Sequence, residues 1–562
     1  MAAHGILERN LLALSVNDPA LGARINRAVG NGGITFEVSR SGLPVPSRVV
    51  SSRRLAYHSL VDPEREAQRS YAASRAAGYL VFLGLGGGYQ LRPFVSGNEA
   101  SRLLVLEPDL GFVRTIMERI DLRAILLDRR VRLWVDPDPE SIRELLLADY
   151  LPAAHGDLRT VPLRPSVDAN PEYFRSVAQC IQEVIGLVAD DYTVQAKFGQ
   201  KWFVNTLVNL PAAEASVGAV PPVHRAIVIG AGPSLEVQID QLPKLRRDAL
   251  LIASDTSLPA LLAGGITPDL VISIDCQLIS YHHFLQGIPP EVPLVLDLAS
   301  PPVLTRLTRK VLFFSSGHPF SRYVSRRWRQ FPVLDTSGGN VSHAAVSLAR
   351  FLGAREIYLL GIDFSYPQGK AYSRGTYLYP LFRSWESRLR PLETLFLSVV
   401  LKNSSIGREW TDEGIRYTTR PLIGYRERLV RSLSASPVRV VQLPGLGLPL
   451  ELEGRSDPSP SPAGAGRCGT VRDMFAAGPP RCDWRTFLRE YRDDLAALPE
   501  PSSPASSYFL ELDDRRRFVW TTLLPAAAAL RERYPHLRGD TARLLREVAD
   551  WSLAMVGRAL DR

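Results

Sequence analysis

The sequence predicts an α/β protein with parallel sheets. Short apolar runs rich in Val, Ile and Leu recur along most of the chain. Segments with a helical spacing of apolar residues separate these runs, and two of the runs pass directly into glycine-rich turns. Fully apolar strands that alternate with helices are typical of a parallel sheet covered on both faces.

The composition is that of a globular protein. The 562 residues are enough for two or three domains, and 45% hydrophobic with 22% charged residues excludes bulk disorder. The net charge of +9 comes chiefly from arginines spread along the chain, so no nucleic-acid stripe is predicted. Four cysteines without metal-ligand spacing fit a reducing compartment. No leader-like start or membrane span is apparent, which predicts a cytoplasmic protein.

Composition and periodicity divide the chain into five parts. A Pro/Gly/Ser-rich stretch separates the last helical pattern from the rest, and the apolar stripe of that pattern suits packing or a dimer face, so an oligomer is allowed. The expected parts are an N-terminal domain (1–170), a helical connector (171–215), a central domain (216–440), a linker (441–480) and a helical region (481–562).

The N-terminal domain is predicted to be Rossmann-like. A helical pattern covers residues 6–29, and a strand at 79–83 runs into a turn of four glycines that begins at Gly84. The next strand ends at Glu107, where an acid could hold a ribose hydroxyl. The alternative is that this turn and acid serve the sheet alone, so a ligand site in this domain stays open.

The central domain begins with a second glycine turn. The run Ile-Val-Ile passes at once into Gly230 and Gly232, which would let the backbone approach a ligand. Pro233 suits the first position of a helix, so free N–H groups around Ser234 are predicted to face a phosphate. Leu235 replaces the third glycine of the dinucleotide fingerprint, so the predicted ligand is a nucleotide but not a dinucleotide.

Two aspartates follow the next predicted strands. Asp255 ends the apolar run 249–254, and Asp275 ends the run 270–274. Ligands bind at the carboxyl ends of strands in open α/β sheets, where both carboxylates and the glycine turn would meet. An aspartate at a strand end can also be only a helix cap.

Further polar residues follow later strands. Ser337 and Gly338 form a turn before a helix at 344–351, and Asp363 comes just after a strand at 356–360. Aromatic hydroxyls and cations after a strand end suit an anion, although such a loop can equally be packing. The loop contains Tyr366, Lys370, Tyr372, Arg374 and Tyr377.

The central segment resembles the motility accessory factor (Maf) glycosyltransferases and, more broadly, the family of the archaeal 6-hydroxymethylpterin diphosphokinases (MptE-like). Segments 57–67 and 84–109 resemble the N-terminal domain of the Maf branch, which favours sugar transfer over pterin chemistry. The resemblance covers about residues 5–435. The motifs that carry it in the central domain are Gly230-Ala231-Gly232-Pro233-Ser234-Leu235, Asp255, Gly265-Ile266-Thr267-Pro268-Asp269, Asp275, Gly338-Gly339-Asn340-Val341-Ser342-His343 and Gly361-Ile362-Asp363.

A more distant likeness is to bacterial sialyltransferases that use CMP-sialic acid, through the glycine turn and residues 352–364. It implies a sialyltransferase-like central fold, in which Gly232, Ser234, Asp255 and the Ser337-Gly338 turn hold the nucleotide and Tyr366 and Tyr372 stabilise the departing phosphate. With the strand-end pattern added, the expected nucleotide-binding residues are Gly230, Gly232, Pro233, Ser234, Asp255, Asp275, Ser337, Gly338 and Tyr366. The expected catalytic residues are His343, Asp363 and Tyr372.

The chain departs from those sialyltransferases in two ways. They carry a histidine base after the aspartate strand, whereas no histidine lies between His343 and His536 here. His343, His318 or Asp363 would then have to act as the base. Ala231 replaces an asparagine of their turn, which removes one contact to the nucleotide and leaves the preference for a base open.

Three functions follow from these resemblances. The first is transfer of a nonulosonic acid (sialic, pseudaminic or legionaminic type) from its CMP-sugar to Ser or Thr of a protein such as flagellin, with no metal or other cofactor required. The second is diphosphate transfer from ATP, in which Asp255, Asp275 and Asp363 would gather Mg²⁺. The third is a non-catalytic scaffold that keeps the fold.

Overall fold

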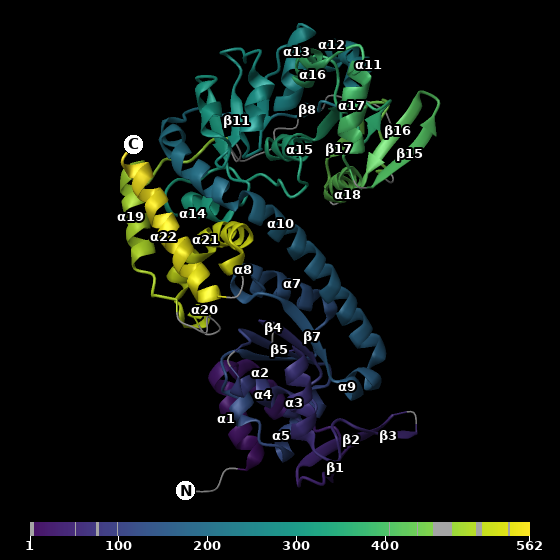
Figure 1. Ribbon diagram of the computed structural model, residues 1–562, viewed down its shortest axis with the longest axis vertical. Helices are drawn as coiled ribbons and strands as arrows, with labels where there is room; N and C mark the ends of the chain where they lie inside the picture. The colour runs from purple at the N-terminus through teal and green to yellow at the C-terminus, as the bar shows by residue number, and fades with distance from the viewer. Residues whose placement is uncertain are drawn as a thin grey trace. The chain divides into compact units, whose positions relative to one another are not determined.

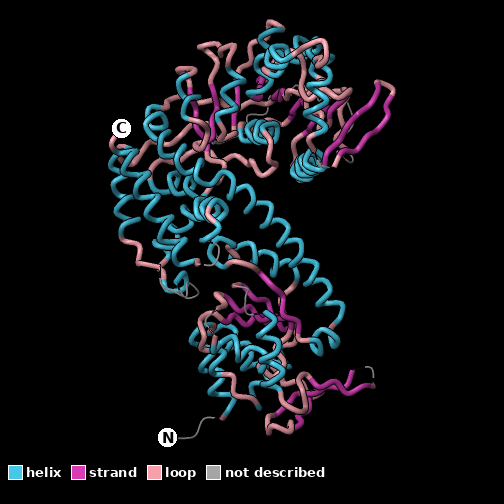
Figure 2. The backbone as a smooth tube through the Cα atoms, in the orientation of Figure 1, coloured by secondary structure: helices cyan, strands magenta, loops and turns pink. Residues whose placement is uncertain are grey.

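A computed structural model describes residues 5–50, 52–74, 78–97, 99–403, 405–434, 436–452, 475–501, 508–537 and 540–562 (Figure 1). The chain forms two units. Unit 1 consists of Met1–Gly199 with Asp494–Leu553, and unit 2 of Gln200–Asp493 with Ala554–Arg562. Each unit contains a parallel sheet and helices, so the predicted fold class is confirmed (Figure 2).

The sheet of unit 1 has four parallel strands in the order β6-β5-β4-β7. Residues on its two faces alternate along β4, since Leu80 and Phe82 belong to one core and Val81 and Leu83 to the other. The strands are β4 (Tyr79–Leu83), β5 (Arg102–Glu107), β6 (Val131–Val135) and β7 (Leu158–Pro162).

Helices cover both faces of this sheet. The first core includes residues of α1 (Ile6–Asn17), α2 (Pro19–Arg27) and α5 (Leu110–Arg119). The second includes residues of α7 (Pro139–Asp149) and of the long helix α10 (Pro171–Ala215), which occupies the residues expected to form a connector.

The helical pattern predicted over residues 6–29 forms two helices instead of one. Asp18 caps α2 by accepting a hydrogen bond from the Leu21 N–H, and Pro19 takes the first helical position. Because proline has no N–H to donate backwards, the first helix stops before it.

The remaining elements of unit 1 are short. Three antiparallel strands form a separate small sheet, and brief helices connect the parallel strands. These elements are β1 (Ile34–Val38), β2 (Pro44–Val50), β3 (Arg53–Ala56), α3 (Pro63–Ser74), η1 (Tyr89–Leu91), α4 (Arg92–Ser96), α6 (Arg123–Leu126), α8 (Pro152–His155) and α9 (Arg164–Ala169).

The end of the chain is helical, as predicted. Within unit 1, α21 packs on α8, and Arg531 donates a hydrogen bond to the Pro152 carbonyl at 3.0 Å. Of the expected apolar stripe, Leu544 and Val548 are buried and serve packing, whereas Trp551 and Met555 are half-buried. The helices are α19 (Trp484–Ala496), α20 (Tyr508–Glu511), α21 (Asp514–Arg533), η6 (Pro535–Leu537) and α22 (Thr541–Leu560).

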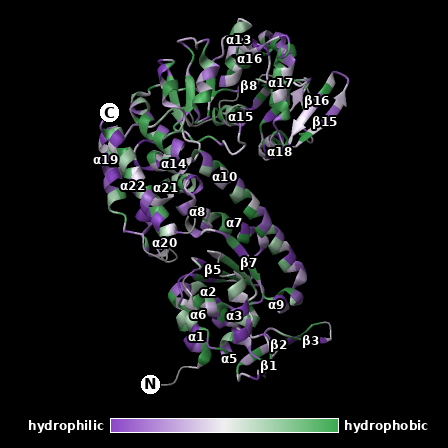
Figure 3. Ribbon diagram, viewed as in Figure 1, coloured by the Kyte–Doolittle hydropathy of each residue, from purple (hydrophilic) through white to green (hydrophobic). Residues whose placement is uncertain are grey.

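Unit 2 is built on seven parallel strands in the order β12-β11-β10-β9-β8-β13-β17. The inner strands are buried. In Figure 3 the ribbon in the region of this sheet is coloured mainly as hydrophobic. The strands are β8 (Arg225–Ile229), β9 (Leu250–Ser254), β10 (Leu270–Ser273), β11 (Leu294–Asp297), β12 (Val311–Phe314), β13 (Glu356–Leu360) and β17 (Arg439–Gln442).

The strand order reverses between β8 and β13. The chain first adds β9 to β12 on one side of β8 and then crosses over to place β13 on its other side. Such a switch point leaves a crevice at the carboxyl ends of the strands. The strands are connected by helices α13 (Leu258–Ala263), α14 (Pro319–Arg327) and α15 (Val341–Phe351). Shorter helical elements also lie in these connections: α11 (Leu235–Gln238), η2 (Ile239–Gln241), α12 (Leu242–Leu245), η3 (Asp255–Ser257), η4 (Leu278–Phe284) and η5 (Pro302–Arg306).

A segment inserted between β13 and β17 carries a second, antiparallel sheet in the order β14-β16-β15. The sequence did not predict this sheet, because its outer strand is mostly exposed and lacks a regular apolar alternation. The segment comprises β14 (Tyr366–Pro367), α16 (Leu378–Trp385), α17 (Leu392–Leu401), β15 (Ile406–Thr411), β16 (Gly414–Thr419) and α18 (Arg420–Ser434).

Part of the expected linker belongs to the fold of unit 2. Strand β17 ends at Gln442, inside the range 441–480, and residues 443–450 pack onto unit 2 through hydrogen bonds such as Leu448 N–H to the Asp363 carbonyl at 2.8 Å. Residues 453–474 of the expected linker lie outside the described residues. Phe475 is fully buried and pairs with Val220.

Candidate functional site

The central glycine turn lies at the switch point and is hydrogen-bonded to the end of β13. Gly230 N–H donates to the Leu360 carbonyl and Gly232 N–H to the Gly361 carbonyl, both at 2.8 Å. Ser234 N–H donates to the Asp363 carboxylate at 2.9 Å. These three N–H groups are therefore already hydrogen-bonded within the protein and do not face a phosphate. The prediction of free N–H groups at this turn is wrong for these three residues.

Close packing explains why this turn needs glycine. A Cβ on Gly230 would come within 2.4 Å of the Gly361 carbonyl oxygen, and one on Gly232 within 2.5 Å of the Asp363 carboxylate. The helix after the turn, α11, has four residues and begins at Leu235, two positions later than Pro233 was expected to start it. The glycines thus allow two strand ends to approach each other.

Residues after β17 close the turn from another side. The Leu446 N–H donates to the Ser234 hydroxyl at 2.6 Å, and the Gln238 amide donates to the Leu443 carbonyl at 3.0 Å. Ser234 is 1% exposed. The part of the chain expected to be a linker therefore covers a residue predicted to bind a nucleotide.

Asp363 is an interior residue of this junction. Its side chain is 6% exposed, and burial raises the pKa of its carboxyl despite the bond from Ser234. Phe364 follows with φ of 47°, a left-handed conformation that costs a residue with a side chain about 1 kcal/mol. This bend sends the chain away from β13 toward the loop of Tyr366 and Tyr372.

Asp255 lies after β9 at the same edge of the sheet. One carboxylate oxygen accepts hydrogen bonds from the Thr256 N–H (2.7 Å) and hydroxyl (3.0 Å). The other accepts from the Ser273 hydroxyl at 2.6 Å. Asp255 is 4% exposed, so its carboxylate is held in one orientation by its neighbours.

Sequence reasoning missed a histidine beside this aspartate. His283 lies in η4, after β10, and its Nε2 is 3.4 Å from the Thr256 hydroxyl oxygen. The Thr256 proton is directed to the closer Asp255 carboxylate, so this hydroxyl can only accept from Nε2–H. The Nδ1 atom then carries the lone pair, and within the described residues it has no hydrogen-bond partner although it is buried.

The signal for His283 was present in the sequence. His282 and His283 follow Asp275 by a few residues, and adjacent parallel strands bring their following loops together. The predicted bases were His343, His318 and Asp363, because the resembling sialyltransferases carry a histidine after the aspartate strand and none lies between His343 and His536 here. The structure places an imidazole on a different loop of the same sheet edge.

Three tyrosines of the loop after β13 gather at this edge. Burial raises the pKa of Tyr372, with additional contributions from Tyr377, Tyr366, Asp255 and Asp275. Burial also raises the pKa of Tyr377, whose ring meets that of His283 edge-on at 4.8 Å between centroids. These phenols stay protonated at neutral pH and can donate hydrogen bonds.

Asp275 is half-buried after β10, and its carboxylate accepts from the Gln277 N–H at 2.9 Å. Its negative charge helps to raise the pKa of Tyr372, so the two side chains are close enough to interact electrostatically. Among the described residues, no group of three or more His, Cys, Asp or Glu side chains has the arrangement of a metal site.

The turn at Ser337 and Gly338 leads into α15 at the same edge. Helix α15 packs on β8, β9 and β10 and precedes β13, so it runs antiparallel to the strands and begins at their carboxyl ends. Asn340 caps it by accepting from the His343 N–H at 3.0 Å. A Cβ on Gly338 would meet the His343 ring, which explains the glycine.

The His343 ring is enclosed beneath this turn. It is 3% exposed, its Nε2 lies 3.6 Å from the Asp335 carboxylate, and burial lowers its pKa despite that charge. His318, another candidate base, stacks on Trp202 at 3.9 Å and lies near Asp297. The structure thus brings Asp255, Asp275, Tyr372 and His283 together and places the other two histidines in separate surroundings.

The glycine turn of unit 1 is filled by its own domain. Gly87 N–H donates to His58 Nε2 at 2.8 Å, and a Cβ on Gly84 would lie 2.3 Å from the Ser166 Cβ. Glu107, the acid considered for a ribose, is 3% exposed and accepts from the Leu85 N–H at 3.0 Å. Burial raises its pKa to about 7. These contacts fit the alternative that the turn and Glu107 serve the sheet alone.

No helix in the described part of the chain combines the length and apolar character that a membrane crossing requires.

Comparison with known proteins gives two family matches. Residues 40–151 match the glycosyltransferase Maf N-terminal domain, and residues 204–369 match the 6-hydroxymethylpterin diphosphokinase MptE-like family. The solved structure of MAf glycosyltransferase from Magnetospirillum magneticum AMB-1 superposes with a TM-score of 0.56, covering 99% of this chain and 96% of that one. At 16% identity this likeness concerns the fold.

Two uncharacterized proteins of Treponema pallidum (strain Nichols) are also similar. One is 37% identical over 148 residues, which are 26% of this chain and 52% of that protein. The other is 32% identical over 166 residues, 29% of this chain and 79% of that protein. The chain thus spans about half the length of the first relative and most of the second.

The fold and the site define an α/β protein with two Rossmann-like sheets, of which the second gathers polar side chains at its switch point. The chain thus carries one segment similar to the Maf N-terminal domain and a second similar to the MptE-like family, on a fold shared with a MAf glycosyltransferase.

Proposed function

We propose that this protein is a cytoplasmic glycosyltransferase that moves a nonulosonic acid from its CMP-sugar to a Ser or Thr hydroxyl of a protein such as flagellin. The observation that carries the proposal is the meeting of buried phenols with an oriented imidazole at the edge of the MptE-like domain. The Maf N-terminal domain favours sugar transfer over other chemistry of that domain.

Each group has one task in the proposed reaction. The acceptor hydroxyl gives its proton to Nδ1 of His283, and its oxygen forms the bond to the anomeric carbon. The bond from that carbon to the CMP phosphate breaks, and the phosphate leaves with the electron pair. The Tyr372 hydroxyl donates a hydrogen bond to the departing phosphate, as donors do at developing charge elsewhere.

His283 is held for this task by Asp255. The carboxylate fixes the Thr256 hydroxyl, and that hydroxyl fixes the ring tautomer with Nδ1 unprotonated. Because Tyr377 covers the ring edge-on, access of the acceptor to Nδ1 requires that Tyr377 moves aside. We therefore propose His283 as the base in preference to His343, whose ring faces Asp335.

A diphosphokinase that uses ATP and Mg²⁺ is the second candidate, because residues 204–369 match the pterin diphosphokinase-like family. In that reaction Asp255, Asp275 and Asp363 would hold the metal. The Asp255 carboxylate already accepts three hydrogen bonds from the protein, and the Asp363 carboxylate accepts a buried one from Ser234. Because these oxygens are already occupied, the sugar transferase is favoured.

Titration of the purified protein with CMP and with ATP, each with Mg²⁺ and with EDTA, separates the candidates. We expect CMP to bind equally in both buffers. ATP binding that disappears in EDTA would instead support the diphosphokinase. If neither nucleotide binds, the protein is better described as a scaffold that retains the fold.

A further inference from the structure

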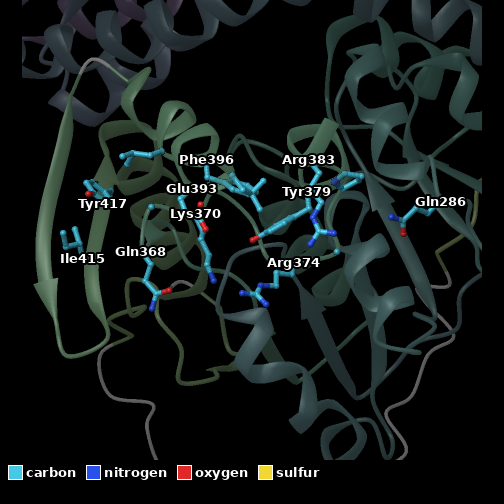
Figure 4. Close-up of a pocket in the computed structure, with 15 residues that line it drawn as sticks. Gln286, Gln368, Lys370, Arg374, Tyr379, Arg383, Glu393, Phe396, Ile415 and Tyr417 are labelled. Carbon is cyan, nitrogen blue, oxygen red and sulfur yellow. The ribbon is translucent and has the colours of Figure 1, made fainter. Parts of the chain in front are cut away.

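A large pocket lies in unit 2, mostly in the segment inserted between β13 and β17, with Gln286 after η4 also lining it (Figure 4). Its volume is about 870 Å³, near the upper end of small-molecule sites. One wall comes from α16, another from α17, and a third from Ile415 and Tyr417 of β16. None of these residues belongs to the strand-end site described above.

The pocket combines an apolar floor with a cationic rim. Leu392, Phe396 and Leu397 come from α17. Lys370, Arg374 and Arg383 supply positive charge, against the one carboxylate of the lining, that of Glu393. In Figure 4 Arg374 and Arg383 lie beside Tyr379 on the side opposite β16. Such a lining suits a ligand that has both apolar and anionic groups.

Only part of the rim charge is neutralised within the protein. Lys370 and Arg374 share Glu236, with nitrogen to oxygen distances of 3.3 and 3.7 Å. Arg383 is exposed and forms no ion pair among the described residues. Between residues 366 and 434 arginine and lysine outnumber aspartate and glutamate by twelve to six, so the inserted segment is basic.

The apolar wall continues beyond the pocket along the small sheet. Ile415 is opposite Trp410 and Tyr417 is opposite Arg408 in the register of β15 and β16, so each pair shares a face. Trp410 is 80% exposed. An exposed tryptophan beside arginine is typical of the residues that dominate protein–protein contacts.

The pocket is connected to the candidate site by one loop. The Tyr379 hydroxyl, in the pocket wall, donates to the Tyr372 carbonyl at 3.3 Å. Glu236, which holds Lys370 and Arg374, follows the central glycine turn by two residues. A polypeptide docked in the pocket would therefore lie next to the proposed chemistry.

We propose that this pocket and the Arg408–Trp410 face bind an acidic segment of the acceptor protein. An apolar side chain of that segment enters above Phe396, and its carboxylates face Arg383 and Arg408. This proposal rests on the proposed function, in which the acceptor is a protein. One sugar ring would fill only part of the volume and would set its hydroxyls against the leucines of α17.

The test measures binding of short fluorescent peptides to the full chain by anisotropy. One peptide contains Asp, Leu and Ser, a second has Lys in place of Asp, and a third has Gly in place of Leu. We expect the first to bind best, and Arg383→Glu and Trp410→Ala each to weaken it about tenfold. Arg309→Glu, at an exposed arginine before the far edge strand β12, and Leu389→Ala, at an exposed leucine, are the matched controls.

Three results would overturn the proposal. They are equal binding of the acidic and basic peptides, absence of binding, and equal losses in the controls and in the pocket variants. Competition by free N-acetylneuraminic acid would instead assign the pocket to the donor. CMP titration of the same variants keeps the two proposals apart, because pocket changes should leave nucleotide affinity unaltered even when peptide binding is lost.

Discussion

The two glycine turns of this chain have similar sequences, and both are closed by their own domains. In unit 1 the turn is filled by His58 and Ser166, and in unit 2 by the end of β13. The difference lies at the neighbouring strand. Glu107 is enclosed between backbone N–H groups, whereas Asp255 orients Thr256 and, through it, His283. A glycine turn after a strand therefore marks a strand-to-helix junction. Whether a reactive group lies beside it depends on what the acid at the end of the next strand contacts.

The largest expected effect concerns His283. Replacing it by alanine should slow sugar transfer about a thousandfold, because the proton of the acceptor hydroxyl loses its base. CMP affinity should stay the same, because His283 acts on the acceptor hydroxyl and not on the nucleotide. His282→Ala is the matched control, since the neighbouring ring is exposed. An equal loss of transfer rate in both variants, or no loss in His283→Ala, would mean that His283 is not the base. The sheet of unit 2 would then not differ from that of unit 1 in carrying a base.

The next effect tests the claim that both turns are packing devices. Gly84→Ala and Gly230→Ala should each lower the free energy of unfolding by about 3 kcal/mol, because the added Cβ meets protein atoms. Gly186→Ala, in α10 with open space around it, should be neutral or slightly stabilising. Urea unfolding measures all three. A stable Gly230→Ala variant that fails only to bind CMP would show that the turn cradles a ligand.

A third prediction concerns the enclosed acid of unit 1. Burial raises the Glu107 pKa to about 7, so the native state prefers the protonated carboxyl. Its contribution to stability is complete below the unfolded pKa near 4.5 and is lost as the pH rises through 7. The loss is about 3 kcal/mol at 1.36 kcal/mol per pKa unit.

Glu107→Gln should remove most of this dependence. The difference between variant and wild type in urea midpoints, measured from pH 5 to pH 8, isolates Glu107. The contribution of His155, whose pKa burial lowers to about 4, to the pH dependence of stability is the same in both proteins and cancels in this difference. Parallel curves would mean that Glu107 is ionised in the folded state.

The smallest expected effect is that of a single phenol. Tyr372→Phe should reduce the rate of transfer about thirtyfold, since one donor to the leaving phosphate is lost. Tyr57→Phe, at a buried phenol of unit 1, is the comparison and should leave the rate unchanged. The measurement is single-turnover transfer at saturating donor. Equal rates for Tyr372→Phe and the wild type would assign Tyr372 to packing.

Local pattern predicted the sheets but not the contacts between distant segments. The strands of both sheets were visible because buried parallel strands are continuously apolar. The contact of Ser234 with Leu446 joins residues 212 positions apart, and no local signal marks it. His283 was not predicted because its proximity to Thr256 arises from the order of the strands in the sheet and not from the order of residues in the chain.

The division of each unit into two stretches of chain affects how the protein can fold during synthesis. Unit 1 contains residues up to 199 and again residues 494–553. Its sheet can form early on the ribosome, but α21 reaches α8 only after more than three hundred further residues have been added. Until then α8 lacks its packing partner, so unit 1 reaches its final structure only after the C-terminal helices have been synthesised.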